Sequence, residues 1–231
     1  MGELYLGVSR SGTSRALDAP TPDGVMEFEE KRGEILNESG YKCKYCGLVS
    51  LKYQHVHHKN GDHRCNEYDN LECCDPLCHL TQHLKFVANN GMGTLVLVPQ
   101  LTQAQLNTLQ RISWVLNYRT LNSKTDDEIL RNYTLRVSHY ISLIERTSAN
   151  VLRLYGFSEP QYLANIFLDM DDIEYFNRQE RYPHIRILFN AKAFSKEIHY
   201  WATEEKSFND LLDHKNWLSI AKNFREQGKQ Q

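Results

Sequence analysis

The cysteines are the residues of this sequence with the clearest chemistry, because all six fall between residues 43 and 78 of a 231-residue chain. Cys43 and Cys46 form a C-x-x-C pair, and Cys74 and Cys78 form a second pair about thirty residues later. Thiolates at such spacing are typical ligands of a tetrahedral zinc ion. The sequence therefore predicts a structural zinc ion (Zn²⁺) at Cys43, Cys46, Cys74 and Cys78, and folding of this segment should depend on it.

The third ligand of this site is left open by the sequence, because Cys73 and Cys74 are adjacent. The spacing to Cys78 favours Cys74, and Cys73 then serves as a small buried apolar residue. We expect Cys65 to take no part. A set of unconnected buried cysteines explains the crowding less well. A redox-active C-x-x-C pair is also disfavoured, because no βαβ unit is predicted around it.

Histidines crowd the same part of the chain, since residues 43 to 83 hold six of the ten. His79 and His83 are four residues apart and would share one face of a helix. The adjacent His57 and His58 lie in a predicted β-hairpin, which would bring them to that helix from opposite sides of the pleat. Imidazoles accept several divalent ions, so whether a second divalent metal binds here is left open by the spacing. We expect His55 and the sixth histidine, His63, to be surface residues.

The order of these groups, VHHKNGD, then NL, then CHxxxH, resembles that of HNH nucleases. The resemblance implies that His58 is a general base and that His57, His79 and His83 hold the catalytic metal. It also implies that Asn70 clamps the loop and orients His58. The alternative, in which these imidazoles only cap or pack a zinc module of the treble-clef (ββα-metal) type, stays open.

The charge balance gives no global field for holding a nucleic-acid backbone, since 27 Lys and Arg face 29 Asp and Glu. DNA binding would have to be local, with a basic rim that includes Lys59, Arg64 and Lys85. The same residues are also typical of an ordinary solvated surface. No apolar run is long enough to span a membrane, and the start of the chain is polar, so we expect a cytoplasmic protein without membrane insertion.

Helices and a hairpin are predicted to position these side chains. Apolar periodicity and turn signals predict helices at 24–38, 79–89, about 102–116 and 126–147, and short helices and turns after 147. They also predict a hairpin between the first cysteine pair and the paired histidines, and a strand at 94–98. Thr102 and Gln105 predict a capping box at the start of one of these helices. The predicted class is α+β: an HNH-like treble-clef zinc module followed by a mainly α-helical region. The predicted parts are a flexible arm at 1–24, the zinc module at 25–92, the helical region at 93–224 and a polar tail at 225–231.

A wider resemblance rests on GTLVLVPQLTQAQLN at 93–107 and RILFNAKAFSKEIHYWA at 186–202, together with the cysteine and histidine motifs. These segments resemble the IcmJ (DotN) family of type IVB secretion and conjugation systems. The resemblance implies an HNH-like zinc adaptor of the coupling complex, at most peripheral at the inner membrane. It would bind the tail of the coupling ATPase, join other coupling-complex proteins and help recruit protein substrates.

The same resemblance implies a family that has lost the nuclease residues, whereas this sequence keeps the histidines and Asn70. Two functions therefore remain in view, an adaptor that binds a partner segment and a metal-dependent HNH endonuclease acting on DNA. The adaptor is favoured because the resemblance extends through the helical region. Whether the chain is an enzyme is left open by the sequence.

Overall fold

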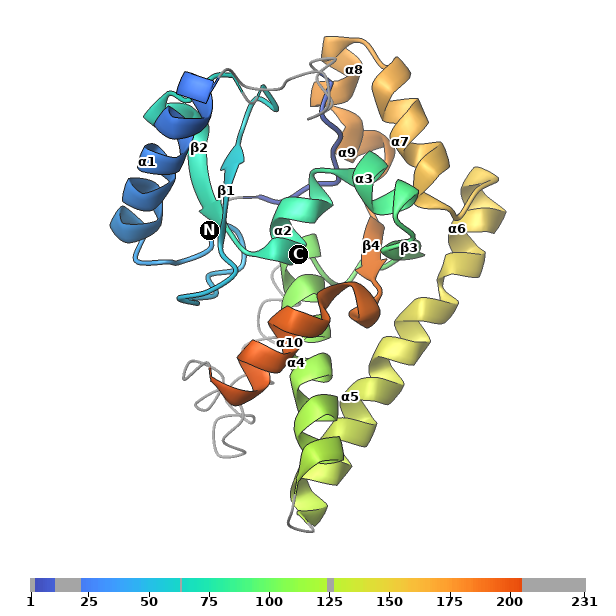
Figure 1. The fold of residues 1–231 in the computed structure, drawn as a ribbon. Helices are drawn as coiled ribbons and strands as arrows, with labels where there is room; N and C mark the ends of the chain where they lie inside the picture. The colour runs from blue at the N-terminus through green and yellow to red at the C-terminus, as the bar shows by residue number, and fades with distance from the viewer. Residues whose placement is uncertain (1–2, 11–21, 63, 124–126, 205–231) are drawn as a thin grey trace.

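The computed structural model describes residues 3–10, 22–62, 64–123 and 127–204, which combine helices with small sheets (Figure 1). The helices are α1 (Pro22–Glu38), α2 (Pro76–Thr81), α3 (Leu84–Asn89), α4 (Gln103–Asn122), α5 (Glu128–Arg146), α6 (Ser148–Tyr155), α7 (Pro160–Asp169), α8 (Asp172–Phe176), α9 (Arg178–Arg181) and α10 (Ser195–Thr203). The strands are β1 (His55–His58), β2 (Leu71–Cys74), β3 (Gly93–Leu97) and β4 (Ile185–Phe189). The predicted α+β class is confirmed at this level. The polar tail predicted at 225–231 lies outside the described residues.

The first sheet pairs β1 with β2 in antiparallel register, with His55 opposite Cys74 and His57 opposite Glu72. The predicted hairpin inside residues 43–56 is wrong. The backbone there turns tightly, with Cys43 N–H donating to Leu48 O and only an isolated bridge between Lys42 and Val49. The strand that carries the paired histidines therefore finds its partner further along the chain. Helix α1 covers one face of this sheet, and α2 starts directly after β2 (Figure 1).

The second sheet pairs β3 with β4 in antiparallel register, although β4 begins at residue 185 and β3 at residue 93. The sequence predicted β3 but only helices and turns around β4. Gly93 is required at the start of β3, because a Cβ atom there would lie 2.7 Å from Leu188 O. Helices α4, α5 and α6 pack against this sheet.

Helices α4 and α5 form a long antiparallel pair that extends away from the sheets (Figure 1). The predicted capping box is present: Thr102 accepts from Gln105 N–H, and the Gln105 side chain accepts from Thr102 N–H. Helix α4 buries Leu106, Val115 and Leu116. The predicted helix at 79–89 is instead two helices, α2 and α3.

One apolar cluster runs through both sides of the predicted boundary at residue 92. It joins residues such as Leu77 and Leu84 of α2 and α3 with Trp201 of α10. Residues 3–10, predicted within an arm, contribute to the same core through the buried Leu4, Leu6 and Val8. Gly7 N–H donates to Thr81 O and Gly7 O accepts from Leu84 N–H, at 3.1 and 2.8 Å. Within the described residues, no helix combines the length and the apolar character needed to cross a bilayer.

Candidate metal centres

The first candidate metal centre is a buried group of three thiols and one carboxylate. One donor atom from each of Cys43, Cys46, Asp75 and Cys78 lies within 4.8 Å of every other. Cys43 and Cys46 come from the tight turn before β1, Asp75 is the N-cap of α2, and Cys78 lies in the first turn of that helix. Three sulfur donors and one oxygen donor in this arrangement fit a tetrahedral zinc ion. The structure thus brings together three of the four predicted cysteine ligands.

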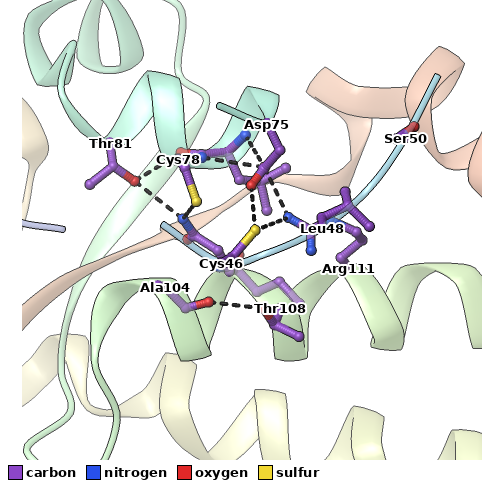
Figure 2. A network of polar contacts seen from close by, with 12 residues as sticks. Cys46, Leu48, Ser50, Asp75, Cys78, Thr81, Ala104, Thr108 and Arg111 are labelled. Atoms are coloured by element: carbon purple, nitrogen blue, oxygen red, sulfur yellow. Dashed lines mark hydrogen bonds and ion pairs between the residues drawn. The ribbon is translucent and has the colours of Figure 1, made fainter. Parts of the chain in front are cut away.

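Asp75 is the fourth member of this group, and the partners of its two oxygens explain how it is held (Figure 2). Oδ1 accepts hydrogen bonds from the backbone N–H groups of Leu77 and Cys78, at 2.9 and 3.4 Å. The same oxygen pairs with the Arg111 guanidinium at 2.9 Å. Oδ2 lies 2.8 Å from Cys46 Sγ. The helix cap and the arginine therefore engage one oxygen, and the other is directed towards the sulfur atoms.

Cys74, which the sequence favoured as a ligand, is not a member of the four-atom group, in which Asp75 is the fourth residue. Cys74 is the last residue of β2 and is completely buried, and this burial raises the pKa of its thiol. The chain then turns, so the next residue both caps α2 and reaches the cluster. Cys73 is buried in the apolar cluster that α1 forms with the first sheet. Spacing alone did not reveal the carboxylate, because an aspartate before a helix is also an ordinary N-cap.

Helix α4 supplies a second layer around this centre. Arg111 is 2% exposed at its side chain and lies 3.7 Å from Cys46 Sγ as well as beside Asp75. Asn107 Nδ2 donates to Cys78 Sγ at 3.4 Å. The Arg111 guanidinium also stacks 5.3 Å from the Trp201 ring centroid. A buried cation offsets the excess negative charge that three thiolates and a carboxylate would leave around a divalent ion.

The thiols of this cluster differ, because burial raises the pKa of Cys78 whereas the pKa of Cys43 is lowered. Hydrogen bonds from Cys46 and Cys78 lower the pKa of Cys43 to about 4. The thiolate is the form that binds metal, and the lowered pKa favours this form at Cys43. These groups fit zinc, and the ion would be held by Cys43, Cys46, Asp75 and Cys78.

The second candidate metal centre is a group of imidazoles beside the first. Ring nitrogens of His57, His79 and His83 lie within 4.8 Å of one another, as the sequence predicted for these three residues. His79 Nε2 is 3.1 Å from His83 Nε2. His55, predicted at the surface, is half-buried and its Nδ1 lies 2.8 Å from His79 Nδ1. A ligand set of imidazoles without carboxylates suits Zn²⁺, Ni²⁺ or Cu²⁺ better than Mg²⁺.

His58, the predicted general base, faces the other side of β1. Its side chain stacks on Phe28 of α1, with ring centroids 5.1 Å apart, and the residue is 4% exposed. Its Nε2 lies 3.0 Å from Asn66 Oδ1. Adjacent residues of a strand point to opposite faces, so His57 joins the imidazole group while His58 lies under α1. Asn66 was not singled out by the sequence, because nothing in its spacing marks it.

Asn70 ties the loop between the two strands together. Its Oδ1 accepts from Asn60 N–H at 3.1 Å, and its Nδ2 donates to Cys65 O at 2.8 Å. This agrees with the predicted clamp, although the hydrogen bond to the His58 side chain comes from Asn66.

The basic residues predicted to contact DNA have different surroundings. Lys59 is exposed, whereas Arg64 binds Asp62 through two nitrogens, each at 3.0 Å. Lys85 donates to Asn165 of α7 at 2.7 Å. His63 lies outside the described residues.

Together, the fold and its two centres define an α+β protein whose core is built around a cysteine and aspartate cluster, with an imidazole group on the same helix. No family model matches the sequence. The chain is 26% identical over 179 residues to the type 4 apparatus protein DotN of Legionella pneumophila subsp. pneumophila (strain Philadelphia 1). This match covers 76% of the chain and 79% of DotN. The resemblance to the IcmJ (DotN) family is therefore confirmed.

Proposed function

We propose that this chain is a zinc-stabilised adaptor in the coupling complex of a type IV secretion apparatus. It binds the cytoplasmic tail of the coupling ATPase and helps to recruit protein substrates, from a cytoplasmic position beside the membrane complex. The observation that carries the proposal is the similarity to DotN, because the 179 matched residues exceed the length of either the metal-binding part or the helical part alone.

An HNH-like treble-clef arrangement of the zinc module is part of this proposal. Its support is the order of the elements around the cysteine cluster: the Cys43 to Cys46 turn, then the β1 and β2 pair, then α2 with Cys78 in its first turn. The zinc ion would join the turn to the helix and hold the module rigid.

The adaptor role is supported by apolar side chains exposed on the helical part. Ile173 and Phe176 of α8 are 76% and 75% exposed, and Leu168 of α7 is 39% exposed. Exposed apolar groups of this kind, when they gather on one part of a surface, are typical of sites that receive a helix or an extended segment of a partner. The α7 to α8 corner is therefore the surface that we assign to the partner tail.

The test uses calorimetry to measure binding of the purified, zinc-loaded chain to the cytoplasmic tail of the coupling ATPase from the same secretion system. We expect a one-to-one complex, and we expect Ile173→Ser with Phe176→Ser to weaken it at least about 10-fold, since truncation of central apolar contacts often costs more than 1 kcal/mol. Leu121→Ser, at an 84% exposed position in α4, is the control and should bind normally. Absence of binding by the unaltered protein would overturn the adaptor proposal.

A second candidate function, a metal-dependent HNH endonuclease acting on DNA, is favoured by the imidazole group of His57, His79 and His83. In that function these residues would hold a divalent cation against the scissile phosphate, with the basic residues named above as the DNA contacts. The position of His58 argues against it. A general base must reach the attacking water, whereas His58 is buried beneath Phe28.

Plasmid cleavage in the presence of Mg²⁺, Mn²⁺, Ni²⁺ or Zn²⁺ separates the two functions. Cleavage that is lost in both His79→Ala and His58→Ala would establish the nuclease and require α1 to move. Cleavage that survives in both variants indicates a contaminating nuclease. With no cleavage by folded, zinc-loaded protein, the adaptor stands as the function.

A further inference from the structure

His55 opens strand β1 two residues before His57, so both side chains lie on the same face of the strand. That face is directed towards α2, whereas Val56 packs with α1 on the opposite face. His55 is thus brought to the imidazole group by the same alternation that removes His58 from it.

The contact between His55 and His79 is a hydrogen bond between ring nitrogens. Their Nδ1 atoms are 2.8 Å apart and the rings are perpendicular, with centroids separated by 4.9 Å. A nitrogen to nitrogen distance this short requires a proton on one ring and a lone pair on the other. The other nitrogen of His79, Nε2, is directed to His83. His79 therefore has one nitrogen facing His55 and the other facing the group of potential metal ligands.

We propose that His55 is a positioning residue for a divalent cation held by His57, His79 and His83. By accepting a hydrogen bond from the Nδ1–H group of His79, it fixes the ring so that Nε2 carries the lone pair that binds the metal. This inference rests on the metal site that the imidazole group forms, and adds to it a residue that does not itself bind the ion.

The physical reason is general for histidine ligands. A metal-binding imidazole usually donates its other N–H group to an acceptor, which fixes the orientation and the tautomer of the ring. Carboxylates and backbone carbonyls are the common acceptors, and here the neutral imidazole of His55 takes that position. Loss of such an acceptor typically lowers metal affinity about 10- to 100-fold.

The test is calorimetric titration of Ni²⁺ into the full, zinc-loaded chain, with zinc content measured before and after. We expect the unaltered protein to bind one Ni²⁺ in addition to its zinc. His55→Ala should keep that stoichiometry and bind about 10- to 100-fold more weakly. His55→Asn, whose side-chain oxygen lies near the position of the lost Nδ1, should recover most of the affinity.

Two controls separate the inference from the site on which it rests. His79→Ala should abolish Ni²⁺ binding, whereas His139→Gln, at an exposed position in α5, should leave it unchanged. If the unaltered protein binds no additional Ni²⁺, the imidazole metal site is refuted and the role of His55 with it. If the site binds Ni²⁺ but His55→Ala is as tight as the unaltered protein, only the role of His55 is refuted. Equal weakening by His55→Ala and His55→Asn would also refute it, because an acceptor would then not be what matters.

Discussion

The cysteine cluster and the imidazole group share helix α2 but differ in how they are enclosed. Cys78 and His79 are neighbours in that helix, yet Cys78 is completely buried whereas His79 is half-buried. The cysteine cluster is covered by α4, which adds Arg111 and Asn107 around it. The imidazole group is formed by β1 and the ends of α2 and α3.

This difference separates two kinds of metal chemistry. Closed sets of four protein donors are typical of structural zinc, while three donors with an open position are typical of sites that exchange ligands. The comparison therefore predicts that the first centre maintains the fold and that the second can be emptied without unfolding the protein.

The largest effect should follow from Cys78→Ser. This change removes a buried ligand, so we expect the bound zinc to fall from one per chain to near zero and cooperative thermal unfolding to be lost, because metal binding at such sites is part of the folding free energy. Metal analysis and circular dichroism measure both. The neighbouring His79→Ala is the matched control, and retention of zinc and of the unfolding transition in Cys78→Ser would contradict the proposed difference.

Arg111→Met should have the next largest effect. Removing the guanidinium breaks the buried ion pair between Arg111 and Asp75, and the loss of one partner of such a pair typically costs about 3–5 kcal/mol in the free energy of unfolding. Urea denaturation measures this loss. Arg119→Met on the same helix, where the guanidinium donates to Ala202 O, should cost only about 1 kcal/mol. Equal losses in the two variants would show that Arg111 does not support the metal centre.

Cys74→Ala distinguishes the two candidates for the fourth ligand. We expect it to keep one zinc per chain and to lose about 1 kcal/mol of stability, as is common for a single buried substitution. Asp75→Ala is the paired variant and should release zinc to a chelator much more readily. The reverse ranking in a chelator competition assay would return Cys74 to the ligand set.

The smallest effect on stability should come from His79→Ala. His79 is half-buried and does not contribute to the apolar core, so we expect the free energy of unfolding to change by less than about 1 kcal/mol. Thermal unfolding in zinc-containing buffer is the measurement. A loss comparable with that of Cys78→Ser would mean that both centres are structural.

Much of the local structure could be predicted from the sequence. The helix predicted at 24–38 is α1, the capping box at Thr102 is present, and the helix predicted at 126–147 is α5. These elements have strong local signals, namely apolar periodicity and caps. The grouping of His57, His79 and His83 was implied by the HNH resemblance, and their ring nitrogens do lie close together.

The rest depends on contacts that local sequence does not specify. The partner of β1 lies beyond a loop, and the partner of β3 lies near the end of the described chain. Arg111 reaches the cysteine cluster from α4, a helix that begins after β3, and no spacing rule links it to Cys46. His55 had a usable signal, because residues two apart in a strand share a face with each other.

X-ray absorption at the zinc edge of the purified chain tests the central claim most directly. Three cysteine ligands and Asp75 predict three sulfur neighbours at about 2.3 Å and one oxygen neighbour at about 2.0–2.2 Å, with one zinc per chain. Four sulfur neighbours would contradict this assignment and favour Cys74 as the fourth ligand. Absence of zinc from folded protein would contradict the structural metal centre itself.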